Sequence, residues 1–297
     1  MFKAATIFTI EFTEPTIVLE APLSEFVACG PTQELSVGWA PPREAHGAMV
    51  EAVGGQLILK LAIETKSVPA SELKRHLEAR VERIEQVTGR KPGKKERREL
   101  TEEIKLDLLP AAFPKRVDIL VWIDRENGLL VIDTATASRA DRVISALVSA
   151  IPGVKIGHIE SSNSPQALMA SMLSDGASMG PRLFLGADCE LAASDETNAK
   201  IRFANCDLDT DEIKGHIRQG KQVNRLGLVF SGRVSFVLDK AGRLRRLKLM
   251  DVVPDSKDES GFDADVTIMT GELTPLIDDL RRAMGGVFDE NARDGGE

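Results

Sequence analysis

Apolar residues in two stretches of the chain, 69–88 and 94–110, recur at spacings of three and four, the period of one helix face. The short Gly- and Pro-containing segment 88–93 separates the stretches, so the sequence predicts two helices that turn back on each other as an antiparallel pair. The positions that carry this prediction are Leu73, Leu77, Val81 and Ile84 in the first helix and Leu100, Ile104 and Leu108 in the second.

On both sides of this helical pair the pattern changes to alternation between apolar and polar residues, which is typical of strands. The helical pair therefore reads as an insertion between strands of one domain. Before it we expect strands at 3–12 and 56–63 and a short helix at 22–28; after it we expect a hairpin of strands 117–123 and 128–134, followed by a helix at 138–150.

The remaining half also mixes both patterns, and the whole chain is therefore predicted to be α+β. We expect a mixed-sheet central domain (1–66 and 115–160), an inserted helical tip (67–114) and a second, α/β base domain (161–297). In the base domain the expected helices are 165–173, 209–219 and 271–284, and the expected strands are 182–185, 199–203, three between 221 and 250, and 264–269.

Composition narrows the class of protein. With 297 residues, 42% hydrophobic and 28% charged, the chain is large enough for two compact units and too apolar for a disordered one. No stretch reaches the ~20 apolar residues that cross a bilayer, so no membrane partner is expected. The three cysteines are far apart and form no CxxC pair, which predicts neither disulfides nor a thiolate zinc site and fits a cytoplasmic location: Cys29, Cys189 and Cys206.

Charge is distributed unevenly along the chain. The segment 66–98 carries a net +6 and the segment 214–248 a net +9, whereas the net charge of the whole chain is −8. Clustered Lys and Arg side chains on an otherwise acidic protein favour a directional surface for DNA phosphates. The alternative is that these cations only solvate exposed helix and strand faces.

Specific cations follow from this distribution as candidate DNA-binding residues. No acidic residue interrupts the loop between the two predicted helices before Glu96. In the second basic segment, cations at odd positions alternate with apolar residues, so one sheet face is expected to carry them. The candidates are Arg90, Lys91, Lys94 and Lys95 in the helical tip, and Arg202, Lys221, Arg225 and Arg233 in the base domain.

Catalytic chemistry is the alternative function. A metal-dependent nuclease could use Asp133, Asp263 and Asp265, although no characteristic spacing selects them. The alternating acids at 207–211 lack the Gly and Glu that a calcium loop needs at its sixth and twelfth positions, and there Asp209 or Thr210 is expected to cap a helix. Phosphate-loop, dinucleotide and hydrolase motifs are missing from the sequence, so ATP-driven motors, dinucleotide enzymes and α/β-hydrolases are not expected. No metal and no cofactor are expected.

Several short motifs, taken in their order and spacing, resemble the family of bacterial recombination-associated RdgC proteins over nearly the full length. The motifs are VGWAPP at 37–42, LLPAAF at 108–113, WID at 122–124, FDAD at 262–265 and MTGEL at 269–273. The resemblance implies a nucleoid-associated, ring-shaped homodimer that encircles double-stranded DNA without sequence preference, with single-stranded DNA as a further ligand. It also implies that the protein is not an enzyme and that it restrains recombination promoted by RecA.

A closed ring of two subunits needs two separate contacts between them. Phe113, held between Pro110 and Pro114 at the end of the helical tip, is the candidate anchor of one contact. The alternative is that Phe113 is buried in the core of its own subunit.

Overall fold

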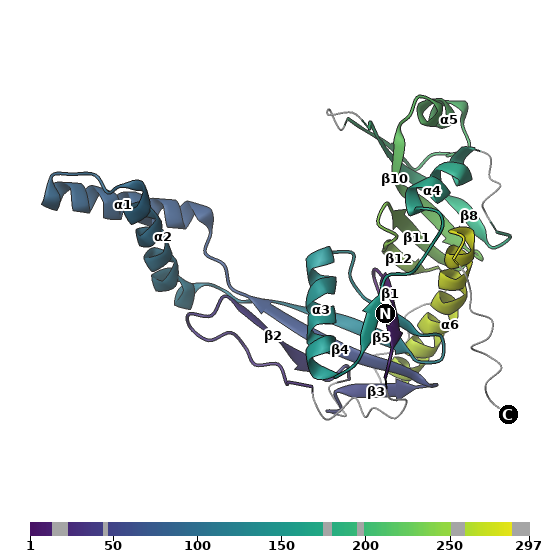
Figure 1. Ribbon diagram of the computed structural model, residues 1–297, viewed down its shortest axis with the longest axis horizontal. Coiled ribbons are helices and arrows are strands. Elements are labelled where there is room, and N and C mark those ends of the chain that lie inside the picture. The colour runs from purple at the N-terminus through teal and green to yellow at the C-terminus, as the bar shows by residue number, and fades with distance from the viewer. Residues whose placement is uncertain (14–22, 44–46, 175–179, 195–198, 251–258, 287–297) are drawn as a thin grey trace. The chain divides into compact units, whose positions relative to one another are not determined.

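The structure is a computed structural model that describes residues 1–13, 23–43, 47–174, 180–194, 199–250 and 259–286 (Figure 1). The chain divides into two compact units. The first comprises Met1–Ala21, Pro41–Leu59 and Leu120–Glu297, and the second comprises Pro22–Ala40 and Lys60–Ile119. The finer division into central domain, helical tip and base domain stays a prediction.

One sheet has the strand order β2-β4-β5-β6-β1-β7, with β3 also paired to β4. The predicted hairpin is present: the Asp124 carboxylate accepts hydrogen bonds from the backbone and side-chain N–H groups of Asn127 (3.1 and 2.8 Å), and Gly128 adopts φ = 59°, which closes the turn between β5 and β6. The strands are β1 (Thr6–Glu11), β2 (Leu35–Ala40), β3 (Val50–Val53), β4 (Gln56–Thr65), β5 (Lys115–Asp124), β6 (Leu129–Ile132) and β7 (Lys155–Gly157), and helix α3 (Ala137–Ala150) follows β6.

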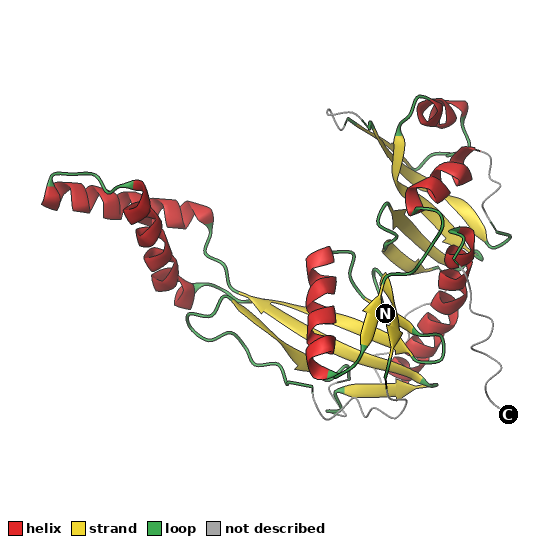
Figure 2. Ribbon diagram, in the orientation of Figure 1, coloured by secondary structure: helices red, strands yellow, loops and turns green. Residues whose placement is uncertain are grey.

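The second unit contains the predicted helical pair, α1 (Ala70–Thr88) and α2 (Lys94–Leu108), followed by a 3-10 turn at Leu109–Ala111 (Figure 2). Gly89 ends α1 in the left-handed conformation (φ = 71°), and its N–H donates to the Glu85 carbonyl. The pair buries little of its own surface, because no residue of α1 is buried and Ile104 is the one buried residue of α2.

Five strands form the second sheet, in the order β12-β11-β10-β8-β9. Apolar side chains from one face of this sheet form a single buried cluster with side chains of α4 and α6, including Leu228, Phe236, Met169 and Leu273. The elements are α4 (Pro165–Ser174), β8 (Leu183–Ala192), β9 (Lys200–Ala204), α5 (Asp211–Arg218), β10 (Gln222–Phe230), β11 (Val234–Asp239), β12 (Leu244–Leu249) and α6 (Glu259–Ala283).

The α+β class is confirmed, with three corrections. The strand pairs whose registers are described are antiparallel, and the parallel contact of Glu25 with Trp39 is an isolated bridge, so the expectation of a mixed sheet is wrong. Residues 264–269 belong to helix α6 instead of a strand, because Val266, Met269 and Leu273 continue its buried stripe. The helix expected at 22–28 is wrong for its described part, 23–28, where Phe26 and Trp39 instead share a backbone hydrogen bond.

Among the described helices, none combines the length and the apolar character that crossing a bilayer requires.

Candidate nucleic-acid interface

The face of the five-stranded sheet that lies opposite the buried cluster carries exposed cations. Along β10, Leu226 and Leu228 belong to the buried cluster, whereas Arg225 extends from the other face, as strand geometry requires. We call this second face the arginine face; its cations are Lys200, Arg202, Arg225, Arg245 and Arg246. Arg202 and Arg246 are the most open, with side chains 71% and 74% exposed.

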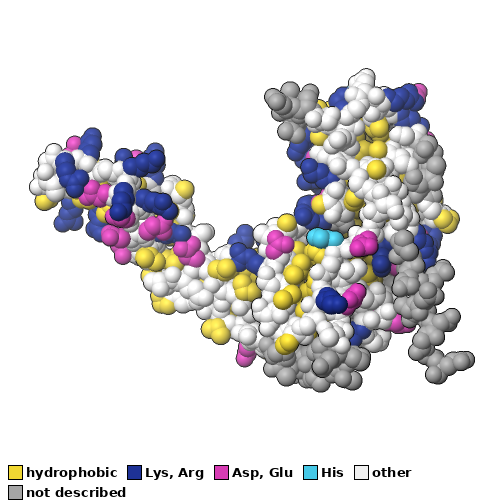
Figure 3. Space-filling model, viewed as in Figure 1, with side chains coloured by type: hydrophobic (Ala, Val, Ile, Leu, Met, Phe, Trp, Pro, Cys, Tyr) yellow, Lys and Arg dark blue, Asp and Glu magenta, His cyan; other side chains and the backbone are white. Residues whose placement is uncertain are grey.

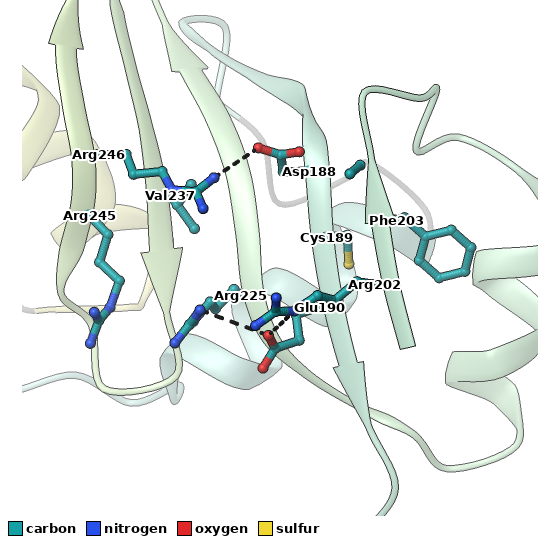
Figure 4. A pocket seen from close by; sticks show the side chains of 10 residues that line it. Asp188, Cys189, Glu190, Arg202, Phe203, Arg225, Val237, Arg245 and Arg246 are labelled. Carbon is teal, nitrogen blue, oxygen red and sulfur yellow. Dashed lines mark hydrogen bonds and ion pairs between the residues drawn. The ribbon is translucent and has the colours of Figure 1, made fainter. Parts of the chain in front are cut away.

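A pocket of about 160 Å³ opens among these cations (Figure 4). Four arginines and two acids, Asp188 and Glu190, are among its lining residues. The lining therefore carries a net positive charge, which suits an anionic group such as a phosphate.

The arginine face is organised as a row of alternating charges. Arg202 on β9, Glu190 on β8, Arg225 on β10 and Asp239 on β11 lie directly opposite one another in the strand registers. The Asp239 carboxylate in turn accepts a hydrogen bond from Nε of Arg245 on β12 (2.7 Å). Glu190 and Asp239 are buried, whereas the side chains of Arg202 and Arg225 are 71% and 42% exposed, so the exposed part of this row is positive.

Glu190 contacts three of the cations. Its carboxylate accepts a hydrogen bond from Nε of Arg202 (3.0 Å) and lies 3.8 Å from Arg225 and 3.9 Å from Lys200. Burial alone raises the pKa of the Glu190 carboxyl, but the hydrogen bond from Arg202 and the charges of Arg225, Lys200 and Arg202 outweigh it, so this pKa lies below its usual value. Glu190 is therefore ionised at neutral pH.

Irregular pairing brings Arg245 and Arg246 to the same pocket. Consecutive residues of a regular strand point to opposite faces, but the register between β11 and β12 shifts between Ser235 and Val237, and Arg246 adopts φ = 51°. The Arg246 guanidinium lies 3.5 Å from the Asp188 carboxylate. A second register shift, between Leu226 and Leu228, accompanies the close approach of Gly227 to the Asp188 backbone.

The structure brings Arg202 and Arg225 together but not Lys221 and Arg233. Lys221 lies just before β10, with its Nζ 3.0 Å from Nδ1 of His216 on α5. Arg233 lies in the turn after β10 and pairs with Glu272 of α6 (3.2 Å). The expectation that Lys221, Arg225 and Arg233 share one strand face is wrong, because the first and last of them lie outside β10.

The cations of the helical pair are exposed and lie next to acids (Figure 3). Arg90 pairs with Glu96 (3.0 Å), Lys91 with Glu85 (3.7 Å) and Lys95 with Glu99 (3.9 Å), and Lys94 is the exposed first residue of α2. Such exposed pairs contribute about 0–1 kcal/mol to stability. These cations therefore remain able to exchange their partners for another anion.

Phe113 is 93% exposed. The alternative that it fills the core of its own subunit is therefore wrong. Its contact with a second subunit stays a prediction.

The three acids of the nuclease alternative have different partners. The Asp133 carboxylate accepts backbone N–H groups of Lys3 (2.8 Å) and Ala4 (3.0 Å), Asp263 pairs with Arg43, and Asp265 borders a small apolar pocket. Burial raises the pKa of Asp133, while those N–H bonds lower it in part. Within the part of the chain that the structure describes, no three His, Cys, Asp or Glu side chains gather as metal ligands would.

The expected cap of α5 is confirmed, with the Thr210 hydroxyl accepting from the Ile213 N–H (3.4 Å).

Sequence reasoning missed Glu190, Arg245, Arg246 and Lys200. The adjacent arginines at 245 and 246 in a predicted strand were a usable signal of an irregular strand. Glu190 gave none, because its role depends on neighbours from two other strands.

The fold and this surface define a class of protein: an α+β protein with an exposed arginine-bearing face on an antiparallel sheet. Comparison with known proteins identifies the family. The family model described as "Putative exonuclease, RdgC" matches residues 1–287. The chain therefore belongs to the RdgC family.

Curated relatives agree with this assignment. The recombination-associated protein RdgC of Cupriavidus pinatubonensis is 38% identical over 256 residues, which cover 84% of this chain and 85% of the relative. The protein of the same name from Bordetella pertussis is 38% identical over 258 residues, with the same two shares. That from Paraburkholderia phymatum is 36% identical over 263 residues, 86% of each chain.

Proposed function

We propose that the protein binds double-stranded DNA through its backbone phosphates and acts in recombination without catalysing a reaction. The observation that carries the proposal is the arginine face, where cations from β9, β10 and β12 surround one pocket. Guanidinium groups donate several hydrogen bonds in a fixed plane and suit phosphate oxygens. Binding should tolerate any base sequence, because phosphate contacts carry no sequence information.

The proposal extends to the assembly that the family resemblance implies. Two subunits would form a ring around the duplex, with Phe113 at one contact, and the ring would restrain recombination promoted by RecA on nucleoid DNA in the cytoplasm. The exposure of Phe113 supports this part, because an aromatic side chain on the surface is a typical interface anchor.

Titration of fluorescent duplexes of unrelated sequence at several salt concentrations tests DNA binding. We expect equal affinities for all sequences and a steep loss of affinity with salt, with a slope of about −0.9 per phosphate contacted. Affinity that is independent of salt, or confined to one sequence, would contradict the proposal.

Incubation of plasmid DNA with the protein and Mg²⁺ or Mn²⁺ separates binding from the nuclease alternative. We expect intact supercoiled plasmid. Nicking that disappears in Asp263→Asn or Asp265→Asn would establish the nuclease instead. The partners of Asp133 and Asp263 support the expectation, because both carboxylates already hold protein groups.

A further inference from the structure

Glu190 is an unexpected residue on a surface proposed to bind an anion. A carboxylate among arginines repels phosphate, and an acid at this position lowers the affinity of the arginine face for DNA if net charge alone matters. Its side chain is only 7% exposed, so it is also a costly group to bury.

The contacts of Glu190 suggest what offsets this cost. Its described polar partners are all cations of the arginine face: Arg202, Arg225 and Lys200. Asp239 differs, because it also accepts backbone N–H groups of Ala241 and Arg243 and thereby closes the turn between β11 and β12. Glu190 has no comparable backbone partner among the described contacts.

Position also distinguishes Glu190. It lies on the strand between those of Arg202 and Arg225 and directly opposite both. Neighbouring strands are about 4.8 Å apart, so one carboxylate between two arginines holds both guanidinium groups within reach of a single anion above them. Without it, two flexible and mutually repelling side chains would lose rotamer freedom on binding.

We propose that Glu190 is a positioning residue that holds Arg202 and Arg225 together as one binding site for a DNA backbone phosphate. The inference rests on the proposed function and deepens it. Glu190 contacts no phosphate itself. It lowers the entropic cost of binding by holding the two guanidinium groups in place, with their outward N–H groups free to donate.

Neutralising Glu190 distinguishes positioning from net charge because the two effects have opposite signs. Glu190→Gln removes one negative charge and so raises the net charge of the protein by one. If net charge alone determined affinity, this variant would bind duplex DNA more tightly. Positioning predicts weaker binding, by about ten-fold, the equivalent of one charge-assisted hydrogen bond.

Asp188→Asn is the matched control. Asp188 lies on the same strand and face, lines the same pocket and is 41% exposed, with Arg246 3.5 Å away. Its neutralisation adds the same charge without disturbing Arg202 or Arg225. We expect Asp188→Asn to bind about two-fold more tightly. Glu190→Gln binding as tightly as wild type, or more tightly, would overturn the inference.

A double-mutant cycle keeps the test decisive if Glu190→Gln lowers the melting temperature. Glu190→Gln should weaken binding less in an Arg202→Gln background than in wild type, because one of its two targets is gone. Equal effects in both backgrounds, measured below the melting temperature of each variant, would reject a role through Arg202.

If the wild-type protein itself fails to bind the duplex, the proposed function fails. If the wild-type protein binds and only the Glu190 variants behave as net charge predicts, the function stands and this inference fails.

Discussion

The Arg246 guanidinium lies 3.5 Å from the Asp188 carboxylate, although two strands separate β12 from β8. The strand registers place Val237 and Gly227 on those intervening strands. Because Gly227 has no side chain, nothing at that position projects between the two charged groups. The positive φ of Arg246 turns its side chain toward the pocket. The shape of the arginine face therefore depends on a residue without a side chain.

Gly227→Ala should lower the free energy of unfolding by about 1–3 kcal/mol. A Cβ atom at this position would lie 3.1 Å from the Asp188 carbonyl oxygen, closer than backbone normally allows. Thermal melting measures the loss. Gly215→Ala, at an open helical position of α5, is the control and should be neutral or stabilising; equal melting temperatures for both variants would contradict the close approach.

Replacing Arg202 or Arg225 by Gln should weaken binding to all duplex sequences alike and reduce the salt slope by about one unit per lost phosphate contact. Fluorescence anisotropy at several salt concentrations measures both quantities. Arg233→Gln is the matched control, because Arg233 pairs with Glu272 of α6. A reduced slope in Arg233→Gln and an unchanged one in Arg225→Gln would reverse our assignment.

Phe113→Ser should leave the melting temperature nearly unchanged, since Phe113 is 93% exposed and its side chain has little packing to lose within its own chain. Self-association should weaken by about 2 kcal/mol or more if Phe113 anchors a contact between subunits. Sedimentation velocity over a range of protein concentrations measures this. Val87→Ser, at another exposed apolar position, controls for surface hydrophobicity; identical sedimentation of wild type and Phe113→Ser would remove Phe113 from the interface.

The thiols should react at different rates. Burial, with smaller contributions from Cys206 and Glu190, raises the pKa of Cys189 to about 12, whereas Cys206 is exposed. At pH 8 iodoacetamide should modify Cys206 rapidly and Cys189 only after unfolding, as mass spectrometry of peptides would show. Rapid modification of Cys189 in the folded protein would contradict its burial.

The same shift gives stability a dependence on pH. The folded protein binds the Cys189 proton more tightly than the unfolded chain, whose thiol titrates near pH 9. Its contribution is therefore complete below pH 9 and is lost as the pH rises toward 12. Cys189→Ala should flatten this alkaline decline in denaturant titrations.

Asp133→Ala should destabilise the protein by about 1 kcal/mol, because the N–H groups of Lys3 and Ala4 lose their acceptor. Asp133→Asn should be milder, since its amide oxygen can still accept. Urea titration of both variants measures the difference. Equal losses would show that the charge of Asp133, and not its acceptor oxygens, holds the N-terminal segment.

Much of the fold could be predicted from local pattern, because most elements bury one face with a regular period. The helices at 70–88 and 94–108 and the hairpin of β5 and β6 are examples. The start of α6 was wrongly predicted as a strand because Val266, Thr267 and Ile268 have high intrinsic strand propensity. The buried contacts of Val266 and Met269 with the distant sheet stabilise the helix instead.

The site was less predictable for a related reason. Alternation could assign a face to Arg225, but register shifts near Arg225 and Arg246 change which side chains meet. The pairing of Glu190 with both Arg202 and Arg225 depends on strand order, which local periodicity does not contain. Arg233 was misassigned because the strand ends at Phe230.

The sparse burial in α1 has a consequence for how the molecule fluctuates. Its backbone hydrogen bonds are intact, but no buried side chain of its own opposes their opening, so α1 should unfold locally at a free energy far below that of the whole protein. Its amide hydrogens should then exchange with solvent much faster than those of β10, whose side chains are largely buried. In the isolated subunit, α1 would unfold locally many times for each global unfolding event, and a protease that needs an unfolded segment could cleave it each time.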